Sequence, residues 1–148
     1  MATVVIDDHL LRDILTGERS ADLEGLASSV ATTGLWLFRL SSAWATPERV
    51  GKLTAPVAAL PADEQARFLE RLTALPDDVE VLHLRDLAWP MAQLQDRHRR
   101  GGRQLSAAMV EALAAAHALD AAIAVSSADV GPNLRAAAEH DGIEFHVL

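Results

Sequence analysis

The stretch that decides the fold is TVVIDD, residues 3–8, in which four β-branched residues run directly into two adjacent aspartates. A short run of this kind is typical of a strand that is buried on both faces. Residues 10–15 repeat leucine and isoleucine at helical spacing, and Gly17 is placed to end that helix. The chain therefore opens with a strand, an acidic turn and a helix.

Strand-like and helix-like segments alternate along the rest of the chain. This alternation predicts a three-layer α/β/α sandwich with a mainly parallel central sheet. Strands are expected at residues 3–7, 79–83, 122–126 and 143–147, with residues 3–7 and 122–126 as parallel neighbours, and helices at 22–30, 63–75, 87–100 and 132–140 and after Ser106. The segment 35–44 fits either a helix or a strand. We find no internal repeat and no linker, so residues 1–148 are expected to form a single domain.

The composition restricts the possible functions. The absence of cysteine excludes disulfides, thiolate metal sites and cysteine nucleophiles. No apolar run is long enough to cross a membrane, and no basic region precedes the first strand as in a signal peptide, so a cytoplasmic protein without membrane contact is expected. The net charge of −8 repels nucleic acid except at a local basic patch.

Acidic residues stand at positions that a parallel sheet brings together. Asp7 and Asp8 follow the first strand, Glu111 lies on an alanine-rich helix, and Asp129 follows the strand expected at 122–126. Ligands of open α/β sheets bind beyond the carboxyl ends of the strands. Clustered carboxylates prefer hard cations, so Mg²⁺ or Mn²⁺ is the expected cofactor.

Three motifs support a family resemblance. They are DDHLL at residues 7–11, EALAAA at 111–116 and IAVSSAD at 123–129, and the tail with LRAAA at 134–138 and GIEF at 142–145 follows the same pattern. The chain resembles the PIN domain family, metal-dependent nucleases that include the toxins of VapBC-type toxin–antitoxin pairs. The resemblance implies a PIN-like fold with Asp7, Glu111 and Asp129 as catalytic metal ligands. It also implies that Ser127 hydrogen-bonds a carboxylate or the attacking water.

The chain departs from the family pattern at three positions. Glu111 replaces the usual aspartate and Ser127 the usual threonine, and both keep the chemistry of the residue they replace. Arg39 stands where the family usually has a glutamate. It adds a positive charge beside the expected metal, so we expect its guanidinium to contact Asp7, Glu111 or Asp129 and to weaken or prevent cation binding.

Two further residues beside the acids could modify the site. Asp8 could compensate for the charge of Arg39, and His9 could transfer a proton or contact phosphate, although a satisfied surface histidine is the simpler interpretation. The acids also have a purely structural interpretation. In that case Asp7 and Asp8 cap a helix, Glu111 pairs with Arg39, and Asp129 begins a turn.

These observations leave two hypotheses open. One is a metal-dependent endoribonuclease, possibly the toxin of a toxin–antitoxin pair. The other is a catalytically degenerate PIN-like binding module. The basic patch Arg97, Arg99, Arg100 and Arg103 could hold an RNA backbone, or could be a solvated helix end. The apolar segment 35–44 could form a homodimer face or a groove for an antitoxin helix.

Overall fold

Five parallel strands form the sheet in the computed structural model, which describes residues 2–46, 48 and 51–148. The strands lie in the order β3-β2-β1-β4-β5. Their bounds are β1 Thr3–Ile6, β2 Ser29–Thr33, β3 Val79–Leu82, β4 Ala122–Val125 and β5 Phe145–Val147. The expected pairing of the first strand with the strand at 122–126 is confirmed, because Val5 is in register with Ile123.

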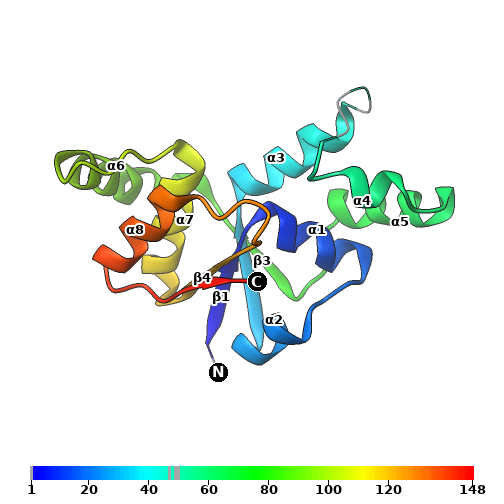
Figure 1. Ribbon diagram of the computed structural model, residues 1–148, viewed down its shortest axis with the longest axis horizontal. Helices are drawn as coiled ribbons and strands as arrows, with labels where there is room; N and C mark the ends of the chain where they lie inside the picture. The colour runs from blue at the N-terminus through cyan, green and yellow to red at the C-terminus, as the bar shows by residue number, and fades with distance from the viewer. Residues whose placement is uncertain (1, 47, 49–50) are drawn as a thin grey trace.

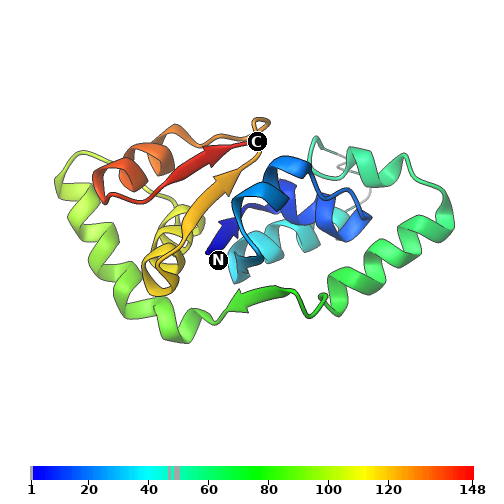
Figure 2. The ribbon, with the colours of Figure 1, turned by 90° about the horizontal axis from the view of Figure 1, so that it is seen from below.

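Helices cover both faces of the sheet (Figures 1 and 2). Their bounds are α1 Asp8–Thr16, α2 Ala21–Leu26, α3 Gly34–Ala45, α4 Ala55–Ala58, α5 Ala62–Thr73, α6 Leu84–Arg100, α7 Ala107–Leu119 and α8 Pro132–His140. Because side chains alternate along a strand, Val5 packs into the core beneath α7 and α8, whereas Val4 and Ile6 pack into the core beneath α1 and α5. The predicted α/β/α sandwich is confirmed.

Strand β2 was not expected from the sequence. Residues 22–30 have helical spacing, but the helix there ends at Leu26 and the chain enters a strand at Ser29. The strand buries two threonines without cost, because each hydroxyl has a hydrogen-bond partner. The hydroxyl of Thr32 donates to the carbonyl of Ile6 at 3.0 Å, and the hydroxyl of Thr33 accepts from the backbone N–H of Trp36.

Helices α3 and α6 differ from the sequence-based expectation. The segment 35–44 is helical, as part of α3, with Trp36 and Leu40 buried. Helix α6 begins at Leu84 rather than at residue 87, so Pro90 lies inside the helix instead of in its first turn. Figure 1 shows that α6 runs to one end of the elongated molecule, from which the chain returns to α7. Among the described helices, none combines the length and the apolar character that spanning a membrane requires.

Candidate functional site

A small cavity lies where the carboxyl ends of β1 and β4 meet the first turn of α1. Its volume is about 40 Å³, and Asp7, Asp8, Arg39 and Asp129 are among the residues that line it. This space is large enough for one ion or water and its contacts, but not for an organic ligand. The sheet therefore brings three acids and one cation to the edge that the sequence predicts.

Asp7 is held by the backbone on both sides. It is the N-cap of α1, where Oδ1 accepts from the N–H of Leu10 at 2.9 Å. Its Oδ2 accepts from the N–H of Ser126, also at 2.9 Å, which ties the loop after β4 to the start of α1. Burial raises the pKa of Asp7 from its ordinary value of 3.8 to about 6, against the lowering effect of these two hydrogen bonds.

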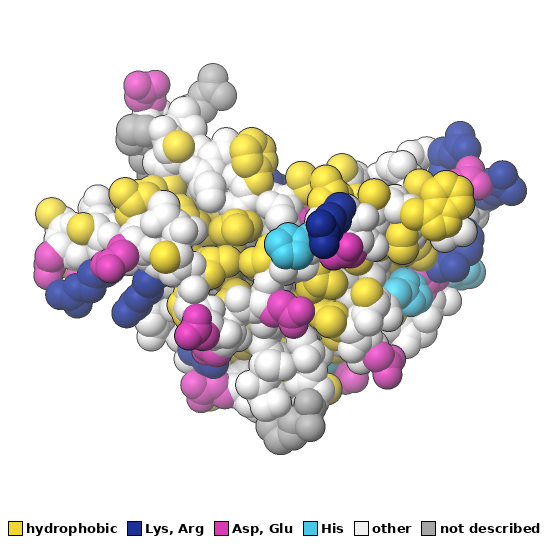
Figure 3. Space-filling view, turned by 180° about the vertical axis from the view of Figure 1, so that it is seen from behind, with side chains coloured by type: hydrophobic (Ala, Val, Ile, Leu, Met, Phe, Trp, Pro, Cys, Tyr) yellow, Lys and Arg dark blue, Asp and Glu magenta, His cyan; other side chains and the backbone are white. Residues whose placement is uncertain are grey.

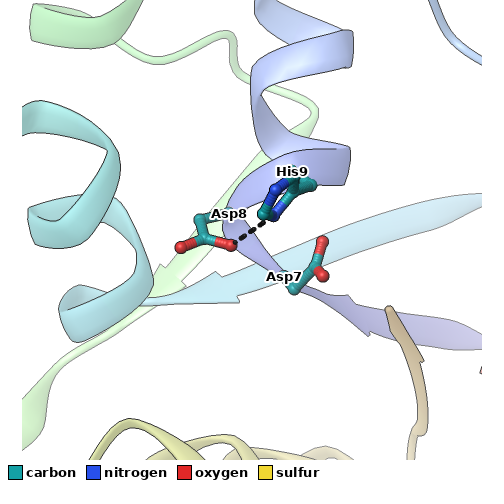
Figure 4. A group of neighbouring side chains, drawn as sticks. All are labelled: Asp7, Asp8 and His9. Atoms are coloured by element: carbon teal, nitrogen blue, oxygen red, sulfur yellow. Dashed lines mark hydrogen bonds and ion pairs between the residues drawn. The ribbon is translucent and has the colours of Figure 1, made fainter. Parts of the chain in front are cut away.

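Asp8 divides its two oxygens between two partners. Its side chain is 1 % exposed, with Oδ1 at 3.1 Å from Nδ1 of His9 and Oδ2 at 3.3 Å from Nε of Arg39. Oδ2 makes no hydrogen bond. Figure 4 shows the Asp7 and Asp8 carboxylates flanking the His9 ring. His9 is itself buried, so the interpretation of this residue as a surface histidine is wrong.

Arg39 links two acids that are distant in sequence. Besides its contact with Asp8, its Nη2 donates to Oδ2 of Asp129 at 3.4 Å. The expected contact with one of the three predicted ligands is therefore present. The guanidinium is about half exposed and both contacts are long, so solvent weakens each ion pair.

Glu111 is placed by a contact that spans most of the chain. Its side chain is buried, and Oε1 accepts from the N–H of Leu35 at 2.9 Å, at the first turn of α3. Oε2 is buried without a hydrogen-bond partner. The pairing of Glu111 with Arg39 that the structural interpretation requires is wrong, because Arg39 contacts Asp8 and Asp129 instead. Ser127 is exposed and is not among the described residues that line the cavity; its backbone N–H donates to the carbonyl of Leu148.

The arginines of the basic patch lie at the end of α6 and in the turn after it. Arg99 and Arg100 contact the carboxylate of Asp96, one turn earlier on the same helix, at 2.8 and 3.0 Å. These ion pairs neutralise part of the positive charge that was expected to bind an RNA backbone. None of the arginines in the patch lines the acidic cavity of the described structure.

The other two arginines join a network around the buried Asp141 and His98 that the sequence did not indicate. Oδ2 of Asp141 accepts from Nη2 of Arg97 at 2.6 Å, from Nε2 of His98 at 3.2 Å and from Nε2 of His117 at 2.8 Å. Arg103 donates in turn to Nδ1 of His98. Burial raises the pKa of Asp141, but the hydrogen bonds from the two histidines and the charge of Arg97 outweigh it and leave that pKa below its usual range. No local pattern connects these positions, so the sequence carries no signal for the network.

Within the described residues, one group of three side chains has the spacing of a metal site. It consists of Asp7, Asp8 and His9, whose ligand atoms lie within 4.8 Å of one another. This group shares only Asp7 with the ligand set implied by the PIN resemblance. Asp129 lines the same cavity as Asp7 and Asp8, and it contacts Arg39.

The comparisons with known proteins support the fold. No protein-family model matches the chain, and no curated protein matches it significantly. Among solved structures, the chain is similar to one in the structure of FitAB bound to an IR36 DNA fragment. The two are 16 % identical with a TM-score of 0.56, over 97 % of this chain and 94 % of the other. At this identity the likeness shows a shared fold, and it agrees with the PIN-like fold predicted from the motifs.

Proposed function

We propose that the protein is a metal-dependent endoribonuclease of the PIN type, the toxin of a toxin–antitoxin pair. The observation that carries this proposal is the gathering of acids at this edge of the sheet, where Asp7 and Asp129 line the cavity and the buried Oε2 of Glu111 has no hydrogen-bond partner. A buried carboxylate oxygen without a donor is costly, and a bound cation removes that cost. The similarity to the FitAB structure adds support at the level of the fold.

Carboxylates are the ligands that such a cation prefers; Asp7 and Asp129 line the cavity, whereas Glu111 is not part of its lining. Asp7, Glu111 and Asp129 would hold Mg²⁺ or Mn²⁺, partly through water, as these ions prefer carboxylates and retained waters. Each of the buried acids keeps oxygen lone pairs beyond those that its backbone partners occupy. When bound, the metal would lower the pKa of a water and stabilise negative charge on a scissile phosphate. The hydroxyl of Ser127 would orient a carboxylate or that water.

Arg39 would limit the affinity of this site. Its guanidinium supplies positive charge to Asp8 and Asp129, which would otherwise attract the metal. A cation that binds between these acids must displace Arg39 or bind against the repulsion of its positive charge. Wild-type affinity for Mn²⁺ is therefore expected to be weak.

A second function, a non-catalytic PIN-like binding module, has its own supporting observation. Both oxygens of Asp7 and one oxygen of Glu111 already accept from backbone N–H groups. These acids therefore stabilise the starts of helices α1 and α3, a role that does not require catalysis. In this alternative, Arg39 is the permanent counter-ion of the cluster.

RNA cleavage in the presence of Mn²⁺ separates the two functions. We expect slow cleavage by the wild type, loss of cleavage in Asp129→Asn, and no change in Asp63→Asn, an exposed acid on α5 outside the cavity. Because Asp129 is about half exposed, its substitution should not unfold the chain. An absence of cleavage by both the wild type and Arg39→Glu would instead support the binding module.

The proposed partners are RNA, an antitoxin and a second copy of the chain. From behind, the surface is hollowed between two projecting ends, and hydrophobic side chains are exposed on both (Figure 3). Phe38 of α3 is 65 % exposed and lines a groove of about 360 Å³. We propose this groove as the contact of a homodimer or an antitoxin helix. Light scattering should show a dimer for the wild type and a monomer for Phe38→Asp; a monomeric wild type would contradict the dimer.

A further inference from the structure

We propose that Asp7, Asp8 and His9 form a second, nitrogen-containing metal site that takes Zn²⁺ or Co²⁺ in preference to Mg²⁺. The inference extends the proposed function, and it rests on that function only in taking the acidic cavity as a Mg²⁺ or Mn²⁺ site. Three consecutive residues reach one point because the strand ends at Ile6 and α1 begins at Asp8. Their side chains lie near one another at the start of α1 (Figure 4).

The geometry of this group is that of a prepared site. All three side chains are buried, at 2 %, 1 % and 6 % exposure, and their ligand atoms lie within 4.8 Å of one another. The Asp8 Oδ1 and His9 Nδ1 atoms are 3.1 Å apart, a separation that two ligands of one transition metal ion also have. Nδ1 of His9 is hydrogen-bonded to Oδ1 of Asp8, so a metal must replace the proton between them, and the neutral imidazole can carry its proton on Nε2 instead.

Arg39 does not compete for this site, because the two oxygens of Asp8 face different partners. Arg39 contacts Oδ2 of Asp8, the oxygen that has no hydrogen bond, whereas Oδ1 faces His9. A metal between Oδ1, Asp7 and His9 therefore leaves the Arg39 ion pair in place. A metal shared with Asp129 does not, because Asp129 is the other partner of Arg39.

Electrostatics and ligand chemistry agree on the class of ion. The N-terminus of α1 opposes a cation with about half a positive charge, but two ionised carboxylates outweigh it. Imidazole suits Zn²⁺ and Co²⁺, whereas Mg²⁺ prefers oxygen ligands only. Mn²⁺ stands lowest in the affinity order of the divalent transition metals, so it should bind this group weakly.

Cobalt titration followed by visible absorption tests the site without reference to nuclease activity. We expect Co²⁺ bands with the wild type, the same bands with the control His83→Gln at an exposed position, and none with His9→Gln. Calorimetry should show that His9→Gln lowers Zn²⁺ affinity by more than about 100-fold, since outer-shell partners of a metal alone are worth about 10–100-fold. Co²⁺ bands should persist in Arg39→Glu.

A measurement on the wild type alone guards against a variant that fails to fold. In nitrogen NMR of the imidazoles, Zn²⁺ should shift Nδ1 of His9 and leave the other histidines unchanged. Unaltered Co²⁺ bands in His9→Gln, an unshifted His9 signal, or no Zn²⁺ binding would overturn the inference. RNA cleavage that needs Asp129, in a protein without a cobalt spectrum, would overturn it while the proposed function stands. A His9-dependent spectrum without any cleavage would support the inference and contradict the nuclease.

Discussion

Two buried aspartates, Asp7 at the carboxyl edge of the sheet and Asp141 at the opposite edge, are satisfied in opposite ways. Asp141 accepts from three charged or polar side chains, and its pKa lies below the usual range. Asp7 accepts only from backbone N–H groups, and burial raises its pKa to about 6. A fully partnered buried acid is a structural element. An acid whose charge is left without a matching cation marks a site that is able to bind one.

The largest expected effect is the loss of the structural acid. Asp141→Ala leaves His98 buried without its acceptor and removes the partner of Arg97 and His117. Removing one member of a buried network costs roughly 3–5 kcal/mol of the free energy of unfolding. The matched control is Asp96→Ala, an exposed acid whose ion pairs are screened by solvent and should change the free energy of unfolding far less. Urea denaturation measures both, and equal losses would show that the network adds nothing.

The pH dependence of stability should separate the two aspartates by sign. The raised pKa of Asp7 means that the folded state holds its proton more strongly than the unfolded state. The contribution of Asp7 to stability is therefore greatest below about pH 4 and falls by about 2–3 kcal/mol as the pH rises to about 6. For Asp141, whose pKa is lowered, the contribution is present above the usual range and is lost as the pH falls through the lowered pKa.

Subtracting the stability of Asp7→Asn from that of the wild type isolates the Asp7 contribution. The difference between the two free energies of unfolding, measured in urea without metal, should decrease between about pH 4 and about pH 7 and be flat above that range. The same subtraction for Asp141→Asn should increase with pH. A flat or rising difference for Asp7 would mean that its carboxyl group is not destabilised by burial.

A smaller effect is expected at Glu111. Glu111→Gln keeps the acceptor for the N–H of Leu35 and removes a buried charge whose second oxygen has no partner. We expect the metal-free protein to gain about 1 kcal/mol of stability. Thermal unfolding of the variant measures it. A marked loss of stability would show that the charge of Glu111 is needed by a partner in the folded state.

The sequence predicted those parts of the fold that depend on local patterns. Gly17 ends α1 with a φ of 85°, and Ser106 caps α7 as expected. The acids at the strand ends meet because parallel strands share an edge. Strand β2 was missed because Val30 and its neighbours alanine and threonine fit a helix as well as a strand, and only tertiary burial decides between them.

The candidate site was predicted less completely, for a physical reason. The contact of Arg39 with an acid followed from the resemblance, since the arginine stands on the helix that faces the strand ends. The hydrogen bond between Glu111 and Leu35 joins residues 76 positions apart and has no local signal. The same holds for His98 and Asp141, which are 43 positions apart. Long-range partners of buried polar groups are fixed by packing, which composition and spacing do not describe.

In the proposed site, Arg39 sets the cation affinity of the acidic cavity. A calorimetric titration with Mn²⁺ tests it on the wild type, on Arg39→Glu, and on Arg85→Glu, which makes the same charge change at an exposed arginine of α6. We expect weak binding by the wild type and by Arg85→Glu, and at least about tenfold tighter binding by Arg39→Glu, given the charge reversal at short range. Equal affinities in all three proteins, or tight binding by the wild type, would contradict it.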